Sequence, residues 1–181
     1  MAVNGLYIVQ GESNAVVALL KKAHRWPRHQ QHLYEQSILY EADPLLRNFT
    51  DLRDVLNSVN DLADMNPDTF LSPFLDVIRS EQTNGPVTAQ ALSSVAKFLS
   101  YGLIDSSSIK ASNALEKIAD AVTHAKFVGS ADPGHYEVVL LRILLTLRIL
   151  LLTPVGRLLS NESVCEIMQS CFRICFEGAL S

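Results

Sequence analysis

The longest apolar stretch of the chain reads VVLLRILLTLRILLL from Val138 to Leu152, and only Arg142, Thr146 and Arg148 interrupt it. It is too long for one strand, it contains neither Gly nor Pro, and at 3.6 residues per turn its apolar side chains fall on every side. It is also shorter than the roughly 20 residues that cross a bilayer, where central arginines would be costly. The run therefore predicts a helix inside a stack of helices, with neighbours on at least two faces.

Helical spacing of apolar residues predicts further helices in most of the remaining chain. A first helix is expected over 13–24 and a fifth over 112–127, whereas Tyr7–Val9 is the only short β-branched run that suggests a strand. The other expected helices are one from Asp43-Pro44 to Asn66-Pro67 and one that starts directly after it, or at Ser72 because of Pro73. A break at Asn84-Gly85-Pro86 precedes a helix with Thr88 as N-cap, and the last helix starts at Asn161 with Ile167, Met168 and Phe172 on its apolar stripe.

Helices of this length with short Pro- and Gly-containing breaks are typical of stacked helical hairpins. We therefore predict an all-α fold, an armadillo/HEAT-like helical solenoid of about seven helices, as a single domain over 1–181. The alternative is a closed bundle, but the apolar surface exceeds what four or five helices around one axis would hide. The final helix has no stop signal, so we expect the sequence to be a fragment of a longer protein.

The polar, His- and Gln-rich segment 25–43 lacks this periodicity and predicts a mobile loop. Its histidines, with His24, give the pattern H-x4-H-x2-H at His24, His29 and His32. The segment contains no cysteine, and its carboxylates begin only at Glu35, so a solvated loop is favoured over a metal site. We expect no metal and no cofactor.

Composition indicates a protein that meets a partner through apolar surface. Hydrophobic residues make up 48% and charged residues 19% of the chain, and mean hydropathy is +0.16, which is high for an isolated domain. The net charge of −4 without a block of Lys and Arg argues against nucleic acid as a partner. No secretory signal opens the chain, so we expect it in the cytoplasm. Cys165, Cys171 and Cys175 are expected to be reduced and buried.

The sequence holds none of the common catalytic motifs: GxSxG, GxxxxGK[ST], HExxH and GxGxxG are all missing. The acids at positions 51, 54, 61 and 64 repeat at helical spacing opposite an apolar stripe, so they are interpreted as a solvated face. A site assembled from distant residues would leave no such trace. An unrecognised enzyme or metal protein therefore stays open as an alternative.

Two charged residues in apolar surroundings have two interpretations. Lys97 interrupts VAKFLSYGLI, and Glu137 precedes the most apolar helix. The simpler interpretation is a snorkelling lysine and an acid that complements the helix dipole. The other is that both lie at the rim of a protein–protein contact, where opposite charges fix the register.

Several segments carry a resemblance to a known family. They are YIVQGE from Tyr7, DPLL from Asp43, VLNS from Val55, PFLDVIRSEQTNGPVT from Pro73, KFLSYGLID from Lys97, ADAVTHAKFVG from Ala119, EVVL from Glu137, LLLTPVG from Leu150 and NESVCEIMQSCFRICFE from Asn161. With these segments the chain resembles the N-terminal dimerisation and cyclophilin-binding (DCB) domain of the large Arf guanine-nucleotide exchange factors, in the Golgi brefeldin A-resistance subfamily.

The resemblance implies a non-catalytic, armadillo-like regulatory domain that precedes a second helical domain and the catalytic exchange domain. It implies partners as well: a second copy of the chain, the adjacent helical regulatory domain, and Golgi membrane or other trafficking proteins. Location on early Golgi membranes, as a peripheral protein, follows from it. Lys97 and Glu137 look like family positions associated with dimer contacts. A helical module that contacts membrane lipid directly is the alternative function.

Overall fold

The computed structural model describes residues 5–25, 43–107, 109–128 and 133–179. Within these ranges the chain forms seven α-helices and no strand, which confirms the all-α prediction. The helices are α1 (Gly5–Arg25), α3 (Pro44–Ser58), α4 (Pro67–Arg79), α5 (Gly85–Ser100), α6 (Ile109–Thr123), α7 (Pro133–Leu152) and α8 (Asn161–Ala179), with short 3-10 helices η1 (Leu62–Asp64) and η2 (Pro154–Leu158).

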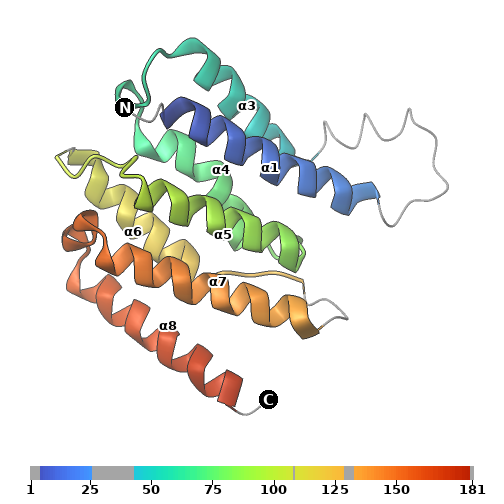
Figure 1. Cartoon of the computed structure of the whole chain (residues 1–181), viewed down its shortest axis with the longest axis vertical. Coiled ribbons are helices and arrows are strands. Elements are labelled where there is room, and N and C mark those ends of the chain that lie inside the picture. The colour runs from blue at the N-terminus through green and yellow to red at the C-terminus, as the bar shows by residue number, and fades with distance from the viewer. Residues whose placement is uncertain (1–4, 26–42, 108, 129–132, 180–181) are drawn as a thin grey trace.

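The helices stack in two layers, as expected for a solenoid. One layer holds α1, α5 and α7, and the other holds α3, α4, α6 and α8. Figure 1 shows that α5 and α7 run in the same direction, as do α4, α6 and α8. The pairs α4–α5 and α6–α7 are thus successive hairpins of the solenoid, and α8 packs beside α6 in the same layer.

A row of aromatic side chains joins α3, α4 and α5. Phe74 of α4 is fully buried and meets Phe49 of α3 and Phe98 of α5 edge to face, at ring-centroid distances of 5.1 and 5.0 Å. Phe70 meets Phe98 in the same way at 5.8 Å. Edge-to-face pairs add to the stabilisation that burial gives, so this row lies at the centre of the core.

The first helix differs from the prediction, because α1 begins eight residues earlier than 13 and includes the segment expected to form a strand. Val9 is fully buried in the helix, and its carbonyl accepts a 2.7 Å hydrogen bond from the Ser13 hydroxyl. Val9, Val16 and Leu20 continue one buried stripe at helical spacing. Tertiary burial of this stripe outweighs the β preference of a three-residue run. Most of the predicted loop over 25–43 lies outside the described residues.

Three other helix boundaries also differ from the prediction, and capping residues explain where the helices start. Asp43 caps α3 as expected, with its carboxylate accepting from Leu45 N–H at 2.8 Å, but α3 ends at Ser58 rather than near 66. Asn66 caps α4, which therefore starts at Pro67 and contains Pro73. Asn84 caps α5 by accepting from Val87 N–H at 3.1 Å, so the expected break at 84–86 is a helix start instead. Asn and Asp caps explain all three starts, with Pro at N1 in α3 and α4 and at N2 in α5.

Glu116 of α6 fixes the start of α8. Its carboxylate accepts from Ser160 N–H at 2.6 Å and also from the Ser163 hydroxyl. Burial acts to raise the pKa of Glu116, but these hydrogen bonds outweigh it, and the pKa lies below the ordinary value of 4.5. A carboxylate with a lowered pKa stabilises the fold above its unfolded-state pKa, and that stabilisation is lost as the pH falls through the folded-state pKa.

Replacing Glu116 by Ala should therefore lower the free energy of unfolding by about 1 kcal/mol at pH 7. The difference from the unaltered chain should be smaller at about pH 3 than at pH 7, because it begins to shrink as the pH falls below the ordinary pKa of 4.5 and is lost through the lower folded-state pKa of Glu116. Urea denaturation at both pH values measures it. Glu166→Ala, at an exposed position of α8, is the matched control and should change little at either pH. An equal loss at both pH values would contradict the role of the charge.

Candidate interaction surfaces

Helix α8 packs against α6 and α7 at one end of the stack. In the preceding hairpins the second helix packs beside the second helix of its neighbour, as α7 does beside α5. The corresponding place, beside α7 and next to α8, lies at the end of the stack in Figure 1. The side chains that face this place show whether it is suited to another helix.

The side of α7 that points away from α5 carries exposed apolar residues together with the exposed Arg148. Val139, Leu147 and Leu150 are fully buried on the side toward the stack. On the opposite side, Leu141 and Leu152 are 55% and 70% exposed. The prediction of neighbours on two faces is right, because α5, α6 and α8 all contact α7, but these neighbours leave its far side uncovered.

Helix α8 carries a similar exposed stripe. Ile167 and Ile174 face the core, whereas Met168, Phe172 and Phe176 recur at four-residue spacing and are 45%, 59% and 68% exposed. We call the exposed residues Val138, Leu141 and Leu152 of α7 and Met168, Phe172 and Phe176 of α8 the open end face. Sequence periodicity placed Met168 and Phe172 in the core stripe, and this was wrong because α8 has apolar residues on two sides.

The prediction of buried cysteines is wrong for two of the three. Cys165 and Cys175 are exposed and only Cys171 is partly buried. Burial, and to a lesser extent the neighbouring Cys175, raises the pKa of the Cys171 thiol. The exposed positions share the outward side of α8 with Phe172 and Phe176. A helix docked on the open end face would therefore cover the thiols as well as the aromatic rings.

Lys97 lies near the end of α5, where it contacts the first helix of its own chain. Its Nζ lies 2.5 Å from the Glu12 carboxylate of α1, and the same carboxylate accepts from the hydroxyl of Ser94 at 2.7 Å. The Lys97 side chain is 48% exposed whereas that of Glu12 is 12% exposed. Lys97 thus helps to join α1 to α5 and still presents part of its side chain to solvent.

Glu137 lies in the second turn of α7 and is exposed. It precedes Leu141 by one helical turn and so borders the open end face. The structure does not bring Glu137 and Lys97 together in one chain, because α5 and α7 are parallel and the two residues lie near opposite ends of that pair (Figure 1). A contact between them would require two chains.

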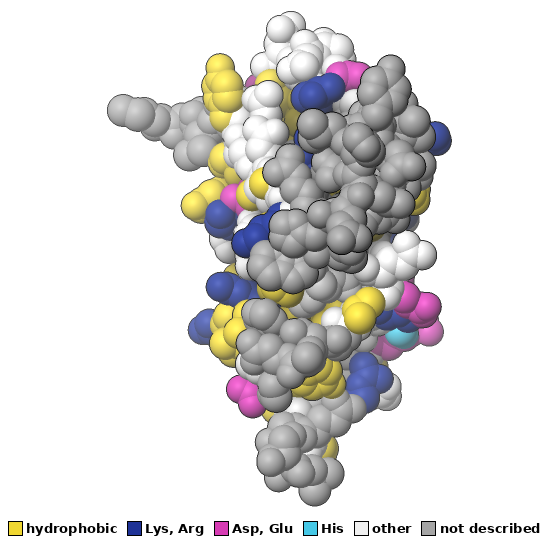
Figure 2. Space-filling view, turned by 90° about the vertical axis from the view of Figure 1, so that its right-hand side faces the viewer, with side chains coloured by type: hydrophobic (Ala, Val, Ile, Leu, Met, Phe, Trp, Pro, Cys, Tyr) yellow, Lys and Arg dark blue, Asp and Glu magenta, His cyan; other side chains and the backbone are white. Residues whose placement is uncertain are grey.

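Neither a metal-ligand cluster nor a helix that could span a membrane is found among the described residues. No three His, Cys, Asp or Glu side chains gather there as potential metal ligands, while His29 and His32 lie outside the described residues. None of the described helices combines the length and hydrophobicity of a membrane span. In Figure 2, the visible described side chains mix basic, acidic and hydrophobic groups rather than forming one basic field.

Comparison with known proteins identifies the family to which the chain is related. No family model matches the chain. Over all 181 residues it is 64% identical to the Golgi-specific brefeldin A-resistance guanine nucleotide exchange factor 1 homolog of Caenorhabditis elegans. It is 32% identical to the ARF guanine-nucleotide exchange factor GNOM of Arabidopsis thaliana over 96% of the chain, and 34% identical to ARF guanine-nucleotide exchange factor 2 of Saccharomyces cerevisiae over 71%.

These matches cover only 9 to 12% of the length of the relatives. The similarity to the first relative extends over every helix described above, and the similarity to the plant protein over nearly all of them. Identity of 64% along the whole chain is far beyond what a shared helical architecture alone produces. The chain therefore belongs to the Golgi brefeldin A-resistance family of ARF guanine-nucleotide exchange factors, and it spans only a small part of the length of these relatives.

Proposed function

We propose that the chain is the non-catalytic DCB-type domain of an Arf guanine-nucleotide exchange factor that acts in Golgi vesicle trafficking. It works by binding other helices through its surface, both in a second copy of itself and in a neighbouring helical regulatory domain of the parent protein. The parent acts as a cytoplasmic protein bound peripherally to early Golgi membranes. The observation that carries this proposal is the open end face, where a two-layered solenoid stops with exposed apolar side chains on α7 and α8.

Burial of this face gives the affinity. Apolar surface removed from water contributes roughly 25 cal/mol per Å², and exposed apolar patches on a folded domain mark protein contacts. Helices with such faces pack against one another by inserting side chains between neighbouring turns. Charges at the edge, such as Glu137, add less to affinity and select the partner and its orientation.

The proposal assigns no catalysis of nucleotide exchange to this chain. The proposal expects that the chain alone does not accelerate release of a fluorescent GDP analogue from an Arf protein. The same assay with a catalytic exchange domain added gives the positive control. Accelerated release by the chain alone would overturn the non-catalytic assignment.

Changing both Lys97 and Glu137 to Ala should weaken self-association by about two- to fivefold, because rim charges contribute roughly 0.2–1 kcal/mol. Glu137→Ala alone should account for most of this, since Lys97 is already paired with Glu12. Analytical ultracentrifugation of the single and double variants gives the dissociation constants. An unchanged constant in the double variant would remove both residues from the contact.

Exposed aromatic side chains also support the alternative of direct lipid contact, because Phe172 and Phe176 could insert into a bilayer. Flotation with liposomes of neutral and anionic lipid separates the two functions. A chain that acts by protein contacts alone stays in the soluble fraction. Flotation that is lost in a Phe172→Glu, Phe176→Glu variant would favour the lipid-contact function instead.

A further inference from the structure

The exposed side of α8 has the residue spacing of a coiled-coil seam. Positions 161, 165, 168, 172 and 175 follow one another at alternating steps of four and three residues, so they form one stripe along the helix. Within this stripe Cys165 and Cys175 are exposed, and Met168 and Phe172 are 45% and 59% exposed. A stripe of this kind is suited to one helix laid along α8.

The stripe is complementary to a second copy of itself when two α8 helices run antiparallel. With a two-fold axis at the level of position 170, residues at equal distances before and after this position become neighbours across the contact. Met168 of one chain then meets Phe172 of the other, and Cys165 meets Cys175. Thioether–aromatic contacts are favourable and thiols pack as small apolar groups, so all four side chains find an apolar partner.

Charges beside the stripe favour the same arrangement. Glu166 and Arg173 are exposed and lie two helical turns apart on one flank of α8. An antiparallel pair brings Arg173 of each chain level with Glu166 of the other, whereas a parallel pair would bring like charges together. One guanidinium nitrogen of Arg173 donates to the Thr123 carbonyl at 3.2 Å and to the Ser170 hydroxyl at 3.1 Å, and the other nitrogens remain for the second chain.

We propose that two copies of the chain associate through their α8 helices, which pair antiparallel with the two-fold axis at the level of Ser170. The inference rests on the proposed self-association and adds its geometry, because each chain contributes the same stripe to a symmetric contact. Phe176 is 68% exposed and lies one turn beyond Phe172, so it borders the stripe and extends the apolar contact.

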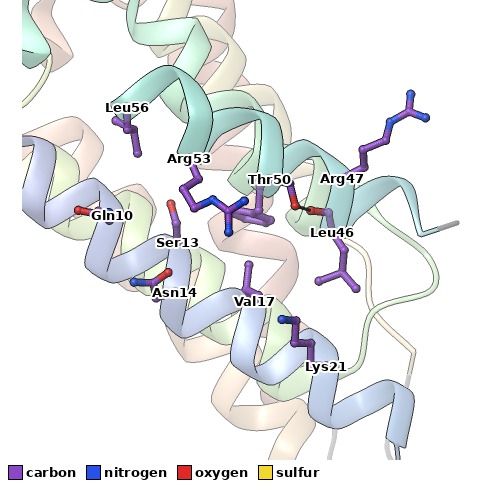
Figure 3. A pocket seen from close by; sticks show the side chains of 11 residues that line it. Gln10, Ser13, Asn14, Val17, Lys21, Leu46, Arg47, Thr50, Arg53 and Leu56 are labelled. Atoms are coloured by element: carbon purple, nitrogen blue, oxygen red, sulfur yellow. Dashed lines mark hydrogen bonds between the residues drawn. The ribbon is translucent and has the colours of Figure 1, made fainter. Parts of the chain in front are cut away.

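The opposite end of the stack offers no comparable apolar stripe among the described residues. Figure 3 shows the hollow between α1 and α3, which is lined in part by Val17, Leu46 and Leu56. Leu46 and Leu56 are only 5% and 6% exposed, so the two helices already cover these apolar side chains. In Figure 1, by contrast, α8 is the outermost helix at its end of the stack. A second copy therefore finds its apolar contact at α8.

Cross-linking between single cysteines tests the antiparallel pairing. One chain keeps only Cys165 and carries Cys171→Ser and Cys175→Ser, and the other keeps only Cys175 and carries Cys165→Ser and Cys171→Ser. A short bismaleimide should join the two chains into a covalent heterodimer when they are mixed, as measured by denaturing electrophoresis with a size tag on one chain. The heterodimer yield should exceed either homodimer yield by about fivefold or more, because like cysteines would lie about 15 Å apart along the helix axis.

A chain without the native cysteines that carries Tyr7→Cys is the matched control. Tyr7 is 72% exposed and lies on α1, away from α8, so this thiol reports random collisions. Circular dichroism checks that each variant is folded. A heterodimer yield no higher than this control would overturn the pairing, and so would equal cross-linking of each single-cysteine chain to itself and to the other.

Exchange of the flanking charges gives a second, independent test. Glu166→Arg alone places two arginines side by side at each end of the pair and should weaken self-association about three- to tenfold. Adding Arg173→Glu restores opposite charges between the chains and should bring the dissociation constant back to within about twofold of the unaltered value. A double variant that associates no better than Glu166→Arg would overturn the proposed register.

Light scattering of the unaltered chain separates the failure of this inference from that of the proposed function. A mass that approaches twice the monomer value without the expected heterodimer cross-link would overturn the α8 pairing and leave self-association standing. A constant monomer mass would overturn both. A monomeric chain that floats with liposomes through Phe172 and Phe176 would replace the second copy by a lipid surface.

Discussion

Changing Phe172 and Phe176 together to Glu is expected to abolish self-association of the chain, with a loss of at least a hundredfold in affinity. The two rings are among the most exposed apolar groups on α8. In the proposed contact they are buried, and a carboxylate buried without a partner costs several kcal/mol. Analytical ultracentrifugation over a concentration series measures the effect.

The matched control changes two exposed aromatic residues away from the open end face. Tyr7 and Tyr101 are 72% and 59% exposed, and Tyr7→Glu with Tyr101→Glu adds the same charge. This control should associate like the unaltered chain apart from a small general repulsion. Equal loss of association in both double variants would show that net charge, rather than the open end face, controls the contact.

Replacing Phe74 by Ala should lower the free energy of unfolding by about 3–5 kcal/mol, the cost of removing a large buried aromatic side chain. Phe74 is fully buried and contacts two other rings edge to face, so the cavity would lie where α3, α4 and α5 meet. Urea denaturation followed by circular dichroism gives the change. Since domains are stable by only about 5–15 kcal/mol, the variant should be close to unfolding at 37 °C.

Two further variants support this measurement. Phe74→Leu keeps most of the buried volume and should lose less stability than Phe74→Ala. Tyr101→Ala removes an exposed ring and should change stability by no more than about 0.5 kcal/mol. A cost below 1 kcal/mol for Phe74→Ala would contradict the position of this ring at the centre of the core.

The sequence predicts the class of fold well because helical periodicity is strong where helices bury one side. Leu52 and Leu56 in α3, and Leu115 and Ile118 in α6, lie on predicted stripes and are buried. Boundaries were less accurate where a capping side chain decides them. Asn84 followed by Gly and Pro was interpreted as a break, but the same residues cap and begin α5.

The surfaces were harder to predict because they depend on which side of a helix faces its neighbours. In α8 both Ile167 and Met168 fit an apolar stripe, and only packing against α6 shows that Ile167 is buried and Met168 is not. The contact of Lys97 with the Glu12 carboxylate joins residues that are far apart in the sequence, so no local pattern predicts it.

The central claim is that the open end face and the surface around it bind a second copy of the chain. Multi-angle light scattering of the unaltered chain over a concentration series tests it most directly. The account predicts a mass that rises from the monomer value of 20.0 kDa toward twice that value as the concentration increases. A constant mass of 20.0 kDa up to high micromolar concentration would contradict it.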